Sequence, residues 1–221
     1  TATDGTRPLL TASVPQSYSS PSWTAARICL AARKFEFLNM ILPIYLYGQA
    51  VLREKAEPID LSEKEEIKTL VGDLWDTIAK ADGCGLASPQ VGISKRVVIV
   101  DGTGLADMYD YLKDFRRTLI NPVVLEESEE TSVYSEGCLS IPGIYADVRR
   151  PKKIKVEYYD ENLERKVEEF DNFAARMVQH ELEHLDGGLF TDDVAPIRKK
   201  LIAKKLQSIL ARKVQTRYKS K

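Results

Sequence analysis

Apolar residues recur at helical spacing in two long segments of the chain. The first helix should begin at a capping box that opens with Ser62 and end near residues 82–83. The second should begin at Asp171 or Asn172 and end at the glycines 187–188. The apolar positions are Ile67, Leu70, Val71, Leu74 and Ile78 in the first helix, and Phe173, Met177, Val178, Leu182 and Leu185 in the second.

Between these helices the pattern is that of strands. β-Branched runs or alternating apolar positions occur at Val97–Val100, Leu119–Val124, Thr131–Tyr134, Ile154–Tyr158 and Lys166–Phe170. The segment Gly83–Gly92 contains three glycines and a proline, so we expect a shaped loop there. This order of elements predicts an α+β fold in which antiparallel β-sheets pack around the second helix.

The two ends of the chain differ from its middle. Residues 1–39 are rich in Ser, Thr, Ala and Pro, and we expect them to be largely disordered. They are either sequence upstream of a natural start at Met40, a remnant of an organellar targeting peptide, or a functional extension. At the other end we expect a C-terminal helix over about Ile197–Tyr218, with an apolar stripe of Ile202, Leu206, Ile209 and Leu210.

Composition and charge exclude several classes of protein. The net charge of −1 gives no reason to expect DNA binding, although residues 196–221 contain ten Lys or Arg and no acidic residue. Three cysteines are too few for a disulfide framework and indicate a reducing compartment. The apolar runs fall short of the roughly 20 residues that a membrane span needs.

The two histidines of the chain form the strongest chemical signal. His180 and His184 are four residues apart on the second predicted helix, with Glu181 beside the first, in the pattern H-E-x-x-H. This spacing places both imidazoles on one helix face, where they can hold one metal ion. The stronger candidate for a third ligand is Cys138, in a turn after a predicted strand, and the alternatives downstream are Asp186, Asp192 and Asp193.

Three segments in this order resemble the signature motifs of bacterial-type peptide deformylases: Gly83–Gln90, Glu136–Ser140 and Gln179–His184. The resemblance covers about residues 40–221, which we expect to form the catalytic domain. It implies a hydrolase that removes the N-formyl group from the N-terminal methionine of nascent proteins and releases formate.

The resemblance also implies a role for each motif residue. The metal ligands would be Cys138, His180 and His184, with ferrous iron as the native ion and zinc, nickel or cobalt as alternatives. Metal-bound water would attack the formyl carbon with Glu181 as general base and then general acid. The side-chain amide of Gln90 and the backbone N–H of Leu139 would stabilise the oxyanion.

Further residues of the motifs would bind substrate. The family implies that the peptide lies as an added strand against the glycine-rich loop and Gly137. Met177, one helical turn before Glu181, and Leu139 would form walls of the methionine pocket. Cys84 would be an apolar wall between the loop glycines Gly83 and Gly85.

The two ends of the chain bear on the partners and the compartment. The basic C-terminal helix either packs on the core with solvated lysines or, as in bacterial members, also docks on ribosomal RNA. We expect a monomer in the cytoplasm, or in an organelle if residues 1–39 derive from a targeting peptide.

Two residues depart from the family motifs. Ser88 stands where the family usually has alanine, and Glu183 stands where it usually has aspartate, as a possible partner of Arg150. Two other functions compete with deformylation. One is a metallopeptidase that cuts internal peptide bonds, and the other is a binding module, such as a ribosome-associated adaptor, that keeps only a structural metal.

Overall fold

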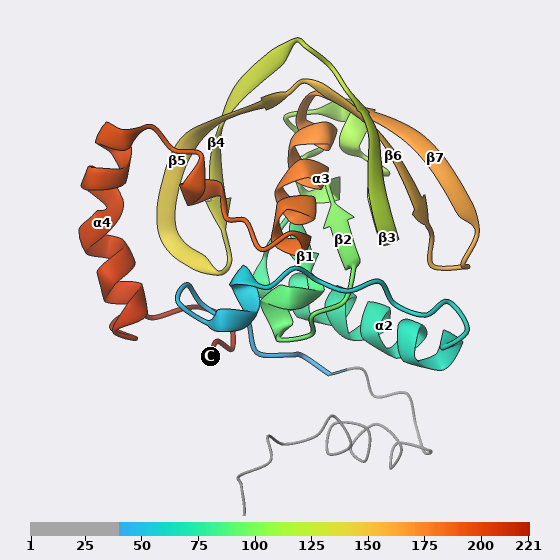
Figure 1. Cartoon of the computed structure of the whole chain (residues 1–221), viewed down its shortest axis with the longest axis horizontal. Helices are drawn as coiled ribbons and strands as arrows, with labels where there is room; N and C mark the ends of the chain where they lie inside the picture. Colours follow the sequence, from blue (N-terminus) through green and yellow to red (C-terminus); the bar gives the residue numbers. More distant parts are fainter. Residues whose placement is uncertain (1–39) are drawn as a thin grey trace, which may run out of the picture. The chain divides into compact units, whose positions relative to one another are not determined.

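A computed structural model describes residues 40–221, and the expectations for residues 1–39 lie outside them (Figure 1). The strands are β1 (Gly85–Ala87), β2 (Val97–Asp101), β3 (Arg116–Glu127), β4 (Thr131–Cys138), β5 (Ile141–Pro151), β6 (Lys153–Tyr159) and β7 (Arg165–Asp171). The α-helices are α2 (Lys64–Ala81), α3 (Asn172–Leu185) and α4 (Pro196–Leu210). Short 3-10 helices are η1 (Ala50–Arg53), η2 (Ser88–Val91), η3 (Thr103–Leu105), η4 (Asp110–Leu112) and η5 (Phe190–Asp192).

The strands of the described residues form two antiparallel sheets. The larger sheet has the order β1-β2-β3-β6-β7, and the smaller one is the β4–β5 hairpin. In the hairpin, Glu136 pairs with Ala146 and Gly137 with Tyr145, before the register shifts at Cys138. The expected α+β fold with antiparallel sheets is confirmed.

Helix α3 lies at the centre of this arrangement, between the β4–β5 hairpin and the larger sheet (Figure 1). Most of its residues are buried, including the polar side chains Arg176, Gln179, His180, Glu181 and His184. Burying so many polar groups is unfavourable unless each finds a partner. This helix is therefore where a polar site is to be expected.

Helices α2 and α3 are confirmed, but the expected start of α2 is wrong. Its N-cap is Glu63, which makes no side-chain cap hydrogen bond. The hydroxyl and backbone N–H of Ser62 instead donate to the carboxylate of Asp60, in a turn just before the helix. The local Asp60 acceptor competes with the capping geometry that Ser62 would need.

Two strands were not predicted. The segment 83–92 is not only a loop, because it contains β1 and the 3-10 helix η2. The hairpin strand β5 alternates buried and exposed residues from Ile144 onward, as a half-buried strand should. Arg150 occupies one of the buried positions of β5, so the sequence does not show an apolar residue at every second position there.

The C-terminal helix is shorter than expected. It ends at Leu210, and Arg212 has a left-handed backbone with φ 56°. In the expected apolar stripe Ile202 and Ile209 are buried, whereas Leu210 is 41% exposed. The chain leaves the helix because residues 219–221 pair with the segment around Ile44 instead.

Within the described part of the chain, every helix is either too short or too polar to serve as a membrane span.

Candidate metal centre

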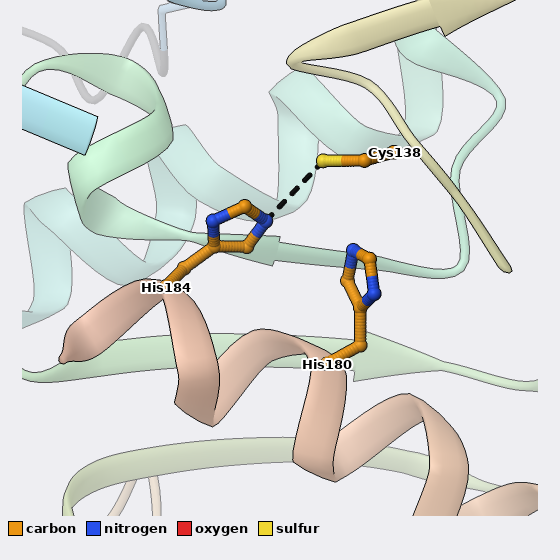
Figure 2. A group of neighbouring side chains, drawn as sticks. All are labelled: Cys138, His180 and His184. Atoms are coloured by element: carbon orange, nitrogen blue, oxygen red, sulfur yellow. Dashed lines mark hydrogen bonds between the residues drawn. The ribbon is translucent and has the colours of Figure 1, made fainter. Parts of the chain in front are cut away.

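The last residue of β4 meets α3 at a cluster of three potential ligands, of which the two histidines are buried. Figure 2 shows Cys138 pointing toward His180 and His184, one helical turn apart on α3. One ligand atom from each of the three residues lies within 4.8 Å of the others. The Sγ of Cys138 is 3.3 Å from Nε2 of His184. The three residues predicted as ligands are therefore brought together.

The chemistry of these donors fits a divalent transition metal. Burial lowers the pKa of His184 well below its ordinary value, so that imidazole is neutral and offers a lone pair. For His180, burial alone would lower the pKa, but hydrogen bonds with Cys138 and Glu136 outweigh it and raise the pKa. One thiolate with two imidazoles is a donor set that suits zinc, iron, cobalt or nickel and leaves a fourth position open.

A carboxylate behind the cluster fixes the orientation of His180. The Nδ1 of His180 lies 2.8 Å from Oε2 of Glu136, which leaves Nε2 for the metal. Arg150 binds both oxygens of the same carboxylate, at 2.8 and 2.9 Å. Arg176 donates to Oε1 at 2.7 Å. Burial raises the pKa of Glu136, but the hydrogen bonds from Arg150 and His180 lower it more, so the carboxylate is ionised.

Glu181 is buried beside the cluster with one oxygen free. Its Oε2 has no hydrogen-bond partner among the described residues. Burial raises the pKa of Glu181 to about 7, where a carboxyl group can both accept and release a proton near neutral pH. A Cβ on Gly85 would lie only 2.7 Å from Cγ of Glu181, so this glycine leaves the room that the carboxylate occupies.

Gln90 and Leu139 lie next to the same cluster. In η2, the Gln90 side-chain oxygen accepts from the N–H of Ala87 at 2.8 Å. Its amide nitrogen is thereby turned toward the β4–β5 turn, 3.2 Å from Oγ of Ser140 and 3.5 Å from Sγ of Cys138. Leu139 and Ser140 form that turn. Both predicted oxyanion donors therefore belong to residues beside the candidate metal ligands.

A cleft of about 830 Å³ opens over these residues. The residues predicted to bind substrate all line it: Gly83, Cys84, Gly85, Gly137, Leu139 and Met177. Cys84 is exposed, whereas Met177 is 6% exposed and packs into the core. At two glycines, neighbouring side chains in the cleft leave no room for a Cβ atom. A Cβ on Gly83 would lie 2.8 Å from Leu139, and one on Gly137 would lie 2.6 Å from the ring of Tyr145.

The aspartates considered as alternative ligands lie outside the cluster. Asp186 pairs with Arg96 at 2.9 Å. Asp192 pairs with Arg53, which lowers the carboxyl pKa against the raising effect of burial. Asp193 is exposed and belongs to no cluster of three ligands in residues 40–221. The arrangement expected of a peptidase with a downstream ligand is therefore not present.

Both departures from the motifs are accommodated locally. Ser88 is fully buried, and its hydroxyl donates to the backbone oxygen of Lys95. Glu183 accepts a hydrogen bond from Arg150 at 2.7 Å, as expected. Because Arg150 also binds Glu136, Glu183 is linked to the network behind His180.

Sequence reasoning missed the roles of Glu136 and Arg176 in this network. Strand alternation could have placed Glu136 on the same face as Cys138, two residues later on β4. Arg176 precedes His180 by one helical turn and shares its helix face. Tyr218, whose hydroxyl reaches Leu139, left no local signal because 79 positions separate the two residues.

Comparison with known proteins agrees with this geometry. A model of the polypeptide deformylase family matches residues 41–200. Peptide deformylase of Christiangramia forsetii is 42% identical over 187 residues, covering 81% of this chain and 95% of that protein. Among solved structures, Arabidopsis thaliana peptide deformylase 1B gives a TM-score of 0.69 at 32% identity, covering 78% of this chain and 92% of that one. The Thermotoga maritima peptide deformylase gives 0.63 at 38% identity, covering 71% and 99%. This chain belongs to the polypeptide deformylase family.

Proposed function

We propose that residues 40–221 form a peptide deformylase domain that removes the formyl group from the N-terminal methionine of nascent proteins. One observation carries the proposal. The buried carboxyl of Glu181, with its Oε2 unpartnered among the described residues, lies beside the Cys138–His180–His184 cluster in the cleft. A structural metal site has no use for such a group, whereas hydrolysis of an amide needs a base.

Cys138, His180 and His184 would hold one divalent ion, with ferrous iron as the native ion and zinc, nickel or cobalt as substitutes. When bound, the ion supplies a Lewis acid that lowers the pKa of water toward about 7. The three ligands would contribute a single negative charge to the bound ion, from Cys138 as a thiolate. Glu136 contributes to the site through His180, because it fixes which imidazole nitrogen faces the ion.

Glu181 would transfer protons, and Gln90 and Leu139 would stabilise the oxyanion. Glu181 takes the proton of the attacking water and delivers it to the methionine nitrogen as the C–N bond breaks. The negative charge that develops on the formyl oxygen accepts hydrogen bonds from the Gln90 amide and the Leu139 N–H. One such donor is worth about 3 kcal/mol of the activation barrier.

The walls of the cleft would set the substrate. Leu139 and Met177 offer apolar contact to the methionine side chain, and the peptide beyond it would pair with β4 near Gly137. Gly83, Cys84 and Gly85 also line the cleft. By resemblance to the family, a tight fit at the glycine-rich loop would favour formyl, the smallest acyl group.

The basic surface of α4 supports a ribosomal partner. Lys199, Lys200, Lys204 and Lys205 are exposed on this helix, and phosphate groups of RNA attract such a surface. The enzyme would act there as a monomer in the cytoplasm, on chains as they emerge. Residues 1–39 would be an extension outside the catalytic domain.

Formate release from N-formyl-Met-Ala-Ser tests the reaction and the base together. The protein is purified without oxygen and loaded with ferrous iron or nickel. Glu181→Ala should retain a full equivalent of metal and lose turnover by about 10²–10⁴-fold, the size of general acid–base catalysis. The exposed Glu129→Ala variant is the matched control and should keep full activity. Turnover that survives in Glu181→Ala, or a metal-loaded protein without turnover, would contradict the proposal.

A further inference from the structure

The C-terminal tail, residues 211–221, reaches the cleft from outside the three family motifs. Four consecutive residues of it line the cleft: Gln215, Thr216, Arg217 and Tyr218. The Tyr218 hydroxyl donates to the backbone oxygen of Leu139 at 2.5 Å. The tail therefore touches the turn that follows the ligand Cys138.

The tail is held in place by the first described segment of the domain. Backbone N–H groups of Ile44 and Leu46 donate to the oxygens of Lys219 and Lys221, at 2.8 and 3.1 Å. The N–H of Lys221 donates back to Ile44 at 2.8 Å. The marked C-terminus accordingly lies beside the first described residues in Figure 1. These bonds fix the last three residues of the tail, and Tyr218 directly before them reaches the turn.

The Leu139–Ser140 turn is anchored on both of its residues. The N–H of Tyr47 donates to the oxygen of Ser140 at 2.8 Å, and the amide of Gln90 donates to its hydroxyl at 3.2 Å. The backbone oxygen of Leu139 accepts a hydrogen bond from the Tyr218 hydroxyl. Removing that hydroxyl would release one end of the turn and leave the other end held.

We propose that Tyr218 is a positioning residue that holds the Leu139 turn so that the Leu139 N–H faces the reacting group. This inference rests on the proposed role of Leu139 as an oxyanion donor. The carbonyl and the N–H of Leu139 belong to two peptide planes that share one Cα, so a displacement of this Cα when the carbonyl is freed also displaces the N–H. Burial raises the pKa of Tyr218 to about 12, which keeps the hydroxyl a donor across the working pH range.

Tyr218→Phe removes the hydroxyl and keeps the ring in its packing. Because a neutral hydrogen bond contributes only modestly to the free energy of a folded protein, kcat for N-formyl-Met-Ala-Ser should fall about five- to tenfold. KM and the metal content should stay within about twofold, since neither the pocket walls nor the ligands change.

Tyr45→Phe is the matched control at the same junction. Its hydroxyl contacts Lys221 of the tail, 3.4 Å from Nζ, and makes no bond to the turn. This variant should keep the kcat of the unmodified protein. Equal loss in both variants would mean that the hydroxyl of Tyr218 only supports the tail, and would overturn the proposal. An unchanged kcat in Tyr218→Phe, or a change confined to KM, would also overturn it.

A second measurement separates this inference from the proposed function. Amide hydrogen exchange across residues 138–141 should speed up at least about threefold in Tyr218→Phe, and not in Tyr45→Phe, whether or not the protein releases formate. If exchange is faster in Tyr218→Phe but the unmodified protein releases no formate, the role of Tyr218 in holding the turn is supported and deformylation is refuted. Unchanged exchange would refute the tether.

Discussion

The carboxylate of Glu136 accepts hydrogen bonds from three buried side chains: Arg150, Arg176 and His180. A lone buried carboxylate would be strongly unfavourable, and the two guanidinium groups offset that penalty. The ionised carboxylate then holds His180 Nδ1 and would leave Nε2 for a metal ion. His180, His184 and Cys138 were predictable from spacing and motif. Arg150 was expected only as a partner of Glu183, and the bonds of both arginines to Glu136 were missed, because a buried charge breaks the apolar pattern on which sequence reasoning depends.

Glu136→Gln tests this arrangement. Glutamine keeps the size of the side chain but lacks the charge, so Arg150 and Arg176 lose their shared partner and His180 loses a strong acceptor. Metal affinity, measured by competition with a chelator, should fall about 10–100-fold, the usual effect of removing a carboxylate behind a histidine ligand. Glu130→Gln, which breaks only the exposed pair with Lys152, is the control and should leave affinity unchanged. Equal affinities of Glu136→Gln and the unmodified protein would contradict the role of Glu136.

At the scale of elements, the position of α3 was predicted closely, although its N-cap Asp171 makes no side-chain cap hydrogen bond and its C-cap is Asp186. The β4–β5 hairpin beside it was predicted only in part, because β5 was missed. The helix has a strong 3.6-residue period and ends at Leu185, just before this C-cap and two glycines. Gly187 is required by its backbone, with φ 75°. Gly188 has a different reason, because a Cβ there would lie 2.5 Å from Cγ of Glu183. The glycine leaves room for the longer side chain that replaces aspartate in this motif.

The pair of Glu183 and Gly188 predicts a non-additive effect on stability. Gly188→Ala should lower the free energy of unfolding by about 1–3 kcal/mol, as overpacking does. In a Glu183→Ala background, the same change should have an effect within about 0.5 kcal/mol, because the colliding Cγ is gone. Gly104→Ala is the control, since a Cβ there meets nothing within 4 Å. Urea unfolding of the four proteins gives the coupling, and additive effects would show that Gly188 does not accommodate Glu183.

At the scale of the whole described domain, the residues of the candidate site were easier to predict than the long-range contacts that hold them in place. Each motif is local, so its residues could be read directly from the sequence. The tail that pairs with residues 44–46 and brings Tyr218 to Leu139 joins distant parts of the chain. Such contacts leave no periodicity, which is why the C-terminal helix was predicted too long. The family resemblance, by contrast, is confirmed over most of the chain.

The central claim is that this domain cleaves a formyl group and not a peptide bond between residues. The most direct measurement is mass spectrometry of the products from N-formyl-Met-Ala-Ser, with N-acetyl-Met-Ala-Ser as a substrate one methyl group larger. Metal-loaded protein should yield formate and intact Met-Ala-Ser, and should leave the acetylated peptide unchanged. Formyl-Met with Ala-Ser among the products, or equal turnover of the acetylated peptide, would contradict the account.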